Sequence, residues 1–210
     1  MGTEQHDPSH WHEAFDKMLE DPEYHMANAL RSNTLMLHEL MKADVKAVLE
    51  VGCGSARMSA LLKRLRPDYQ VRATDIDPKV CASASRIVER LKVDVDIECF
   101  DALSVPYADQ SWDVVVSQGL VEHYDDEWIR KFVAEQTRVA RWLYLDIPLV
   151  HMMMAGHAYG DERRRFANEW LQSVAQGYYV GVMHLLGQPG QEEYLVLALT
   201  RDAKAPWIRI

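Results

Sequence analysis

The chain has 210 residues, of which 48% are hydrophobic and 26% charged, so it is long enough for one domain with a sizeable core. Its formal net charge of -9 at pH 7 argues against a general nucleic-acid binder, because that function needs a dense basic face. The sequence shows no apolar run near the roughly 20 residues that cross a bilayer, no secretory signal and, among three cysteines, no CxxC pair. We therefore expect a cytoplasmic protein without a membrane span, a disulfide framework or a zinc framework.

Residues 1–43 predict a helical segment that precedes the main domain at 44–210. A first helical pattern is interrupted at Asp21-Pro22, where Asp suits the N-cap and Pro the first turn of a second helix. Apolar residues at helical spacing extend this second helix to about Lys42. We expect the N-terminal helices to form a lid over the ligand site. The candidate lid residues are Trp11, His12 and Tyr24.

After this segment, short apolar runs alternate with helical patterns. Strands are predicted at about 46–51, 71–75, 94–99, 112–117 and 141–147. Helices are predicted at about 55–66, 78–92, 126–138 and 161–176. Two further strand-like runs, at 178–186 and 192–200, flank a GQPG turn and predict a closing antiparallel hairpin. The pattern indicates an α/β fold: a doubly wound, Rossmann-like, seven-stranded and mostly parallel sheet with helices on both faces.

The first predicted strand runs into a glycine turn, in which one residue separates Gly52 from Gly54. Glycine permits a tight turn and lets a ligand approach the backbone closely, but several cofactor classes use such turns. The dinucleotide fingerprint needs a third glycine where this chain has Arg57, and the phosphate loop needs a lysine that this turn lacks. Glu50 lies just before the turn, where a carboxylate suits an ammonium group rather than a phosphate.

Carboxylates also follow the second and third predicted strands, at the edge of the sheet where ligands of such folds bind. Asp75 ends the second strand, where it is aligned to accept hydrogen bonds from both hydroxyls of a ribose. Asp77 is expected to cap the helix that begins at Pro78, a role that we do not assign to Asp75. Asp101 follows the third strand, where it can accept from an adenine amine. These positions predict an adenosine-like ligand without choosing among the cofactors that contain one.

Several segments together resemble the class I S-adenosylmethionine-dependent methyltransferases, in order and in spacing. They are Glu50-Val51-Gly52-Cys53-Gly54, Asp75-Ile76-Asp77, Phe100-Asp101-Ala102 and Trp112-Asp113-Val114-Val115-Val116-Ser117. Leu120-Val121-Glu122-His123 is similar to the leucine–glutamate–histidine segment of the small methyltransferase-domain group. The resemblance covers about residues 45–150. The chain departs from the family at Ala56, where a third glycine is common, and at Ala140-Arg141-Trp142, where a Pro-Gly-Gly turn is common.

The resemblance implies an enzyme that uses S-adenosylmethionine and releases S-adenosylhomocysteine. It places the two glycines at the methionine portion, Asp75 at the ribose, and Asp101 with Ala102 at the adenine. The backbone carbonyls of Ser117 and Gln118 are expected near the ammonium, which the carboxylate before the turn supports through water. The expected cofactor-binding residues are Glu50, Gly52, Cys53, Gly54, Asp75, Ile76, Asp101, Ala102, Ser117 and Gln118.

Methyl transfer from a sulfonium is an in-line displacement, in which the protein mainly aligns the reactants and excludes water. A base is needed only for an acceptor that arrives protonated, and His123 is the candidate, with Glu122 to orient it. Alternatively, His123 orders the loop beneath the cofactor. Some relatives bind a divalent cation through Glu-x-x-Glu-His and a later histidine. Here Gly119 replaces the first glutamate, although His151 or His157 fits the later position, so we predict no metal.

The resemblance implies acceptor contacts at Pro148–Tyr159, where three methionines, two histidines and a tyrosine suggest either a pliable, partly apolar pocket or, equally, a loop packed on the end of the sheet. We expect a small, partly apolar or aromatic acceptor with an oxygen or nitrogen nucleophile first, a polypeptide second and a nucleic acid last. Two other functions stay open: a non-catalytic cofactor-binding subunit that regulates another enzyme, and a nicotinamide oxidoreductase. The sequence does not define the oligomeric state.

Overall fold

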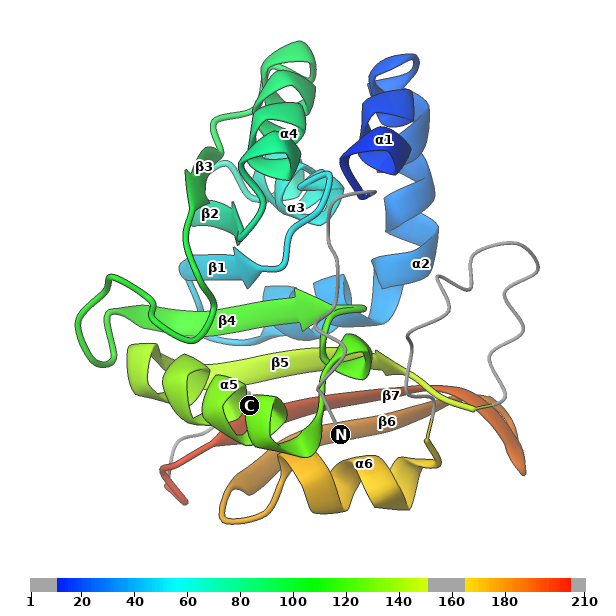
Figure 1. The fold of residues 1–210 in the computed structure, drawn as a ribbon, viewed down its shortest axis with the longest axis vertical. Coiled ribbons are helices and arrows are strands. Elements are labelled where there is room, and N and C mark those ends of the chain that lie inside the picture. Colours follow the sequence, from blue (N-terminus) through cyan, green and yellow to red (C-terminus); the bar gives the residue numbers. More distant parts are fainter. Residues whose placement is uncertain (1–10, 151–164, 205–210) are drawn as a thin grey trace, which may run out of the picture.

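The structure, a computed structural model, describes residues 11–150 and 165–204. Its centre is a seven-stranded sheet with the strand order β3-β2-β1-β4-β5-β7-β6 (Figure 1). The strands are β1 (Ala47–Val51), β2 (Gln70–Asp75), β3 (Asp96–Cys99), β4 (Trp112–Gln118), β5 (Ala140–Pro148), β6 (Tyr179–Gln188) and β7 (Gln191–Thr200). The helices are α1 (Trp11–Asp16), α2 (Pro22–Lys42), α3 (Arg57–Leu65), α4 (Pro78–Arg90), α5 (Asp126–Val139) and α6 (Ala167–Val174). Short 3₁₀ turns lie at η2 (Lys17–Leu19) and η3 (Val121–His123).

The strand order reverses at β1, which pairs in parallel with β2 on one side and with β4 on the other. Parallel pairing continues outward from both, between β2 and β3 and between β4 and β5. The predicted doubly wound, mostly parallel α/β sheet is therefore confirmed. In such sheets the crevice at the carboxyl ends of the strands beside this reversal binds ligands. The glycine turn that follows β1 lies at this position.

The predicted C-terminal hairpin forms, and β7 is inserted between β5 and β6. Only β7 runs antiparallel to its neighbours, so β6 points the same way as β5. The apolar sequence of β7 explains its inner position, because residues 195–199 are at most 2% exposed and so pack on both faces of the sheet. In contrast, most side chains of β6 are exposed, as suits the edge of the sheet.

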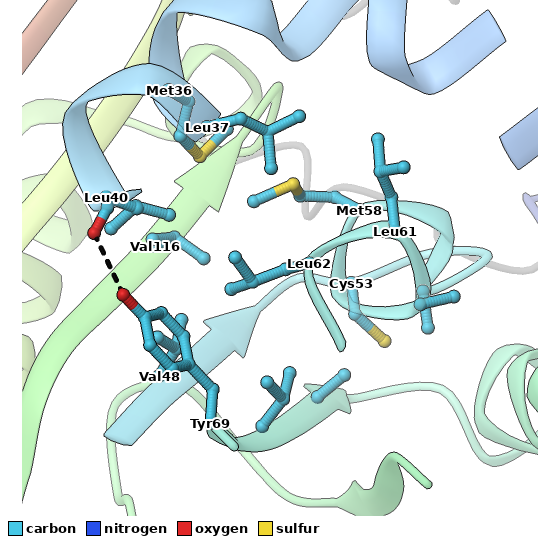
Figure 2. Packing of buried hydrophobic residues seen from close by; sticks show 14 of the residues in the cluster. Met36, Leu37, Leu40, Val48, Cys53, Met58, Leu61, Leu62, Tyr69 and Val116 are labelled. Carbon is cyan, nitrogen blue, oxygen red and sulfur yellow. Dashed lines mark hydrogen bonds between the residues drawn. The ribbon is translucent and has the colours of Figure 1, made fainter. Parts of the chain in front are cut away.

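Two apolar layers cover the two faces of the sheet. One layer joins the sheet to α2, α3 and α4, and Figure 2 shows its centre, where Met36 and Leu37 of α2 lie near Met58 and Leu62 of α3. At the edge of this layer, the Tyr69 hydroxyl donates to the Leu40 carbonyl of α2 at 3.3 Å. The second layer joins the sheet to α5 and α6. Each fully buried Leu, Met or Phe contributes about 1.5–3 kcal/mol relative to an exposed one, so both layers fix the helices that carry the site.

Aspartate caps begin three of the helices, as the sequence predicts for two of them. Asp21 accepts from the Tyr24 amide at 3.0 Å, and Asp77 accepts from the Lys79 amide at 2.8 Å. Proline occupies the first turn of both helices, where its missing amide costs no hydrogen bond. The Asp125 side chain also accepts a backbone hydrogen bond at the start of α5. These caps set where α2, α4 and α5 begin.

The boundaries differ from the prediction where a residue adopts left-handed backbone geometry. Ala56 has φ 52°, so α3 begins at Arg57 rather than at residue 55. Lys92 has φ 53°, so α4 ends at Arg90 rather than at residue 92. The helix predicted at 161–176 is shorter in the described residues, where α6 spans Ala167–Val174, and residues 161–164 lie outside them.

Replacing Lys92 with glycine is expected to raise the free energy of unfolding by about 1 kcal/mol, because glycine carries no left-handed penalty. Lys92 is exposed, and the Val93 amide donates to the Val88 carbonyl at 3.2 Å in the C-terminal motif that favours glycine here. Urea denaturation measures the change. Glu89→Gly, on the exposed face inside α4, is the control and should lower stability by about 1 kcal/mol. A loss of stability in the Lys92 variant would contradict this account.

Candidate functional site

The glycine turn after β1 brings the backbone close to two side chains. Gly52 has φ +71° and Gly54 has φ +51°, a region that side-chain-bearing residues rarely adopt. A Cβ atom at Gly52 would lie 2.8 Å from Leu120, which follows β4, and one at Gly54 would lie 2.5 Å from the Phe15 ring of α1. Both glycines are therefore required by conformation and by space. Leu120 and Phe15 therefore pack directly against the backbone of the turn.

Glu50 lies beneath this turn and is 6% exposed. Its Oε2 atom accepts hydrogen bonds from the Ser59 amide at 3.1 Å and from the Ser59 hydroxyl at 2.5 Å. Burial raises the pKa of the Glu50 carboxyl to about 7, although these hydrogen bonds and the nearby Arg57 oppose the shift. Glu50 thus ties the end of β1 to the first turn of α3. Its contact with a ligand ammonium remains a prediction.

Asp75, at the end of β2, holds the turn from the other side. Its Oδ2 atom accepts from the Gly54 amide at 3.1 Å, and its Oδ1 atom accepts from the Asp77 amide at 3.2 Å. Burial raises the pKa of Asp75, while these backbone hydrogen bonds lower it. Asp77 caps α4, as predicted, whereas Asp75 does not. Ile76 is 51% exposed beside Asp75, and Cys53 is buried within the turn.

The loop after β3 carries Asp101 and Ala102 towards the same edge of the sheet. The Asp101 carboxylate accepts from the Leu103 amide at 2.8 Å and is exposed. The Gln136 side chain of α5 donates to the Ala102 carbonyl at 2.6 Å. Backbone and side-chain contacts therefore hold both residues in place, as a binding loop requires.

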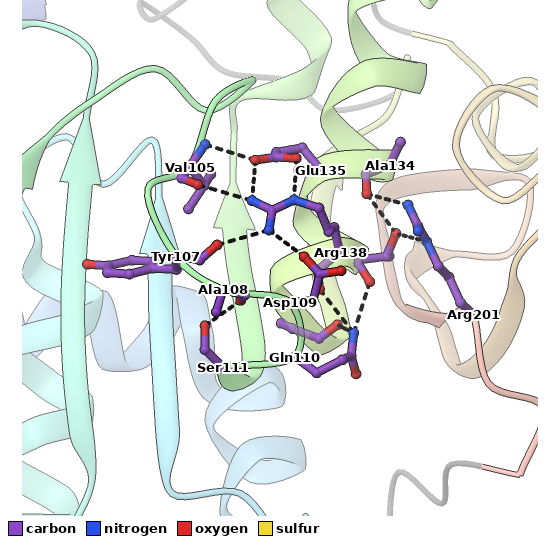
Figure 3. Close-up of polar contacts among 12 residues, drawn as sticks. Val105, Tyr107, Ala108, Asp109, Gln110, Ser111, Ala134, Glu135, Arg138 and Arg201 are labelled. Atoms are coloured by element: carbon purple, nitrogen blue, oxygen red, sulfur yellow. Dashed lines mark hydrogen bonds and ion pairs between the residues drawn. The ribbon is translucent and has the colours of Figure 1, made fainter.

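Arg138, at the end of α5, anchors the rest of this loop (Figure 3). Its guanidinium donates to the carbonyls of Val105 and Tyr107 at 3.0 and 2.9 Å, and to Asp109 and Glu135 at 2.7 Å each. These carboxylates raise the pKa of Arg138, so it stays charged. Because the loop backbone is tied to a helix of the core, its position is set by the fold.

The end of β4 carries two predicted site residues, Ser117 and Gln118. Ser117 is 2% exposed, and Gln118 donates from Nε2 to Asp146 Oδ2 of β5 at 2.8 Å. Asp146 is 6% exposed, and its Oδ1 atom is buried without a hydrogen-bond partner among the described residues. Burial raises the pKa of Asp146 to about 6.

Sequence reasoning missed Asp146. A single carboxylate inside the apolar run WLYLDIP was the available signal, because such a residue is costly to bury without a purpose. Its neighbour in the register is Gln118, a pairing that only the sheet reveals.

The predicted base, His123, lies in η3 just past β4 and is 8% exposed. Its Nε2 atom is 4.0 Å from the Glu122 carboxylate, and its ring meets Trp11 of α1 edge to face at 5.5 Å between centroids. Trp11 therefore reaches this edge, as the lid prediction requires. In contrast, Tyr24 is 62% exposed and contacts the ring of His25. The Nδ1 atom of His12 is buried without a hydrogen-bond partner among the described residues.

The sheet brings the predicted cofactor residues to the carboxyl ends of β1, β2, β3 and β4. No cluster of three or more metal-ligating side chains occurs within residues 11–150 and 165–204. Most of the predicted acceptor segment, including His151, Met152–Met154, His157 and Tyr159, lies outside those ranges. No helix of the described part is both long and apolar enough to cross a membrane.

Comparison with known proteins places this fold in a class. The fold resembles a methyltransferase of Aquifex aeolicus described as S-adenosylmethionine-dependent, with a TM-score of 0.66, 22% identity and coverage of 93% of this chain and 99% of that one. It also resembles magnesium protoporphyrin IX methyltransferase of Synechocystis PCC 6803 with bound S-adenosylhomocysteine, with a TM-score of 0.64, 14% identity and coverage of 95% and 90%. The architecture is thus the Rossmann-like methyltransferase fold.

Sequence comparison then assigns the domain. Residues 48–142 match the family described as methyltransferase domain. Ribosomal protein L11 methyltransferase of Thermosipho africanus is 41% identical over 75 residues, 36% of this chain and 28% of that protein. Malonyl-[acyl-carrier protein] O-methyltransferase of Haemophilus influenzae is 30% identical over 130 residues, 59% and 48% of the two. The chain spans less than half the length of these curated relatives. Residues 48–142 thus match a methyltransferase domain in sequence, and the chain shares its fold with structures described as S-adenosylmethionine-dependent methyltransferases.

Proposed function

We propose that this chain transfers a methyl group from S-adenosylmethionine to an oxygen or nitrogen atom of a small, partly apolar acceptor. The observation that carries the proposal is the buried Asp146 carboxylate at the carboxyl end of β5, whose Oδ1 atom has no donor among the described residues. A hydroxyl or amine acceptor supplies the missing donor, whereas a carbon or thioether acceptor does not. Relatives named as N- and O-methyltransferases agree with both nucleophiles.

The residues at the carboxyl edge fit the cofactor. Gly52 and Gly54 carry no side chain, which suits close approach of the methionine portion to the turn, and Leu120 and Phe15 pack beside them. Asp75 lies at the end of β2, where its carboxylate would accept hydrogen bonds from the ribose hydroxyls, and Ile76 offers an exposed apolar face beside it. When bound, S-adenosylmethionine supplies an electrophilic methyl group on a positively charged sulfur.

The contribution of the protein to such a reaction is placement and exclusion of water. Glu50 joins β1 to α3 across the glycine turn through Ser59, and Asp75 accepts from the Gly54 amide, so the backbone of the turn is fixed before a ligand arrives. We infer that Asp146, oriented by Gln118, accepts a hydrogen bond from the acceptor nucleophile and takes its proton. His123, with Glu122 beside it, stays the alternative base.

A polypeptide side chain is the second candidate acceptor. The relative from Thermosipho africanus is named for a ribosomal protein, which favours it. The net charge of -9 favours neither candidate but disfavours a nucleic acid.

Incubation of the purified chain with methyl-labelled S-adenosylmethionine and a fractionated cell lysate tests the proposal. We expect label in the small-molecule fraction with the natural chain and much less label with Asp75→Ala. Label in the protein fraction would replace the small acceptor with a polypeptide. Cofactor binding without label in either fraction would support a non-catalytic regulatory subunit and overturn the proposal.

A further inference from the structure

We propose that Trp11 and Phe15 of α1 form an aromatic wall at the methionine end of the cofactor site, which favours the cationic sulfonium over the neutral thioether. This inference rests on the proposed function, because it concerns the same site. It assigns to α1 a preference for the charged donor over the neutral product, which a simple lid does not have. Three groups of contacts lead to it.

The first contact joins α1 to the glycine turn. A Cβ atom at Gly54 would lie 2.5 Å from Phe15 Cζ and 3.0 Å from both Cε atoms of the ring. The Phe15 ring therefore lies directly on the Gly54 backbone, which a larger residue would prevent. Gly54 also donates its amide to Asp75, so the ring, the turn and the end of β2 meet at one place.

The second set of contacts extends the aromatic surface towards the end of β4. Trp11 stacks on Phe15 with 5.9 Å between ring centroids and 18° between their planes. The Trp11 ring then meets His123 edge to face at 5.5 Å. Trp11 thus bridges the glycine turn and η3, which carry the proposed methionine site and the alternative base.

In the third set, side chains of α4 contact α1, which lies beside α4 (Figure 1). Asp16 accepts from Arg86 at 2.7 Å and from the Ser83 hydroxyl, and Arg90 donates to the Leu19 carbonyl. No residue of α1 is fully buried. Polar contacts at its end therefore position this helix, while its aromatic side chains are half-buried against the site.

An aromatic face attracts a cation within about 6 Å of the ring centroid, by about 0.5–2 kcal/mol depending on desolvation. In methyl transfer the carbon leaves sulfur without the electron pair of their bond, so a positive sulfonium becomes a neutral thioether. The aromatic wall then loses its attraction for the product. It would help to retain the donor before transfer and to release the product afterwards.

Isothermal titration calorimetry with S-adenosylmethionine and S-adenosylhomocysteine tests this proposal without an acceptor. For Trp11→Leu and Phe15→Leu we expect the affinity for S-adenosylmethionine, divided by the affinity for S-adenosylhomocysteine, to fall by about 2- to 30-fold. Trp11→Phe keeps an aromatic face and should restore most of the ratio. Tyr24→Leu, which removes an exposed aromatic side chain of the same segment, is the matched control and should leave the ratio unchanged.

Equal weakening of both ligands in the leucine variants would overturn the proposal, because it would indicate packing rather than recognition of charge. An unchanged ratio would overturn it as well. Circular dichroism melting of each variant separates loss of fold from loss of selectivity, and Trp11→Phe supplies the comparison if a leucine variant unfolds. If the natural chain binds neither ligand, the proposed function fails with it, whereas binding without selectivity overturns only the aromatic wall.

Discussion

Replacing Asp146 with asparagine is expected to lower the rate of methyl transfer by roughly a hundredfold, while the affinity for S-adenosylhomocysteine stays within about twofold. Asparagine keeps the shape of the side chain and an oxygen for Gln118 to bond, but it cannot take a proton. The labelled-methyl assay measures the rate, and calorimetry measures the affinity.

His123→Gln is the comparison variant, because the sequence predicts His123 as the base. It should reduce the rate by less than Asp146→Asn does, since Gln118 orients Asp146 and leaves Oδ1 to the acceptor. If Asp146→Asn keeps its rate and His123→Gln loses it, proton removal belongs to His123. The pH profile adds a check, because the loss of Asp146 should remove a rise in rate near its pKa of about 6.

In the natural chain, Glu50 is expected to lower the free energy of unfolding by roughly 3 kcal/mol as the pH rises from about 4.5 to 7. Replacing Glu50 with glutamine should remove this decline. In the folded protein burial raises the pKa of Glu50 from 4.5 to about 7. Between these values the unfolded chain has lost its proton and the folded chain has kept it. The folded state therefore binds more protons, and the free energy of unfolding falls as pH rises through this window.

Below pH 4.5 Glu50 is protonated in both states, so it makes no difference there. A glutamine at this position carries no charge and still accepts from Ser59, so its stability curve should be flatter. Urea denaturation of both proteins at several pH values gives the difference. Glu127→Gln, on the exposed surface of α5, is the matched control and should leave the slope unchanged. Parallel curves for the natural chain and Glu50→Gln would contradict the shift.

Local sequence patterns predict much of this fold. The alternation of apolar strands with helices identifies the sheet, and the aspartate caps at Asp21 and Asp77 locate two helix starts. Left-handed residues are harder to foresee, because alanine at 56 and lysine at 92 disfavour that geometry. The insertion of β7 between β5 and β6 has one local signal, the apolar run at 195–199, since either strand of a hairpin can otherwise pair with the sheet.

Some residues of the candidate site can likewise be predicted from local sequence, and others depend on the fold. The glycines and Asp75 carry local signals, because their chemistry depends on a turn or a strand end. Asp146 carries only the local signal of a carboxylate in an apolar run, and its pairing with Gln118 on the neighbouring strand is visible only in the sheet. The contact of Trp11 with His123 joins residues more than a hundred positions apart, and no periodicity predicts it.

Titration of S-adenosylhomocysteine into the natural chain and into Asp75→Ala tests the central claim most directly. Asp75 is proposed to bind the ribose and also holds Gly54, so its loss should weaken binding by about tenfold or more. Asp77→Ala, which removes only the cap of α4, should cost less affinity. Unchanged affinity in Asp75→Ala, or binding of NADH in preference to S-adenosylhomocysteine by the natural chain, would contradict a methyl-donor site at this edge of the sheet.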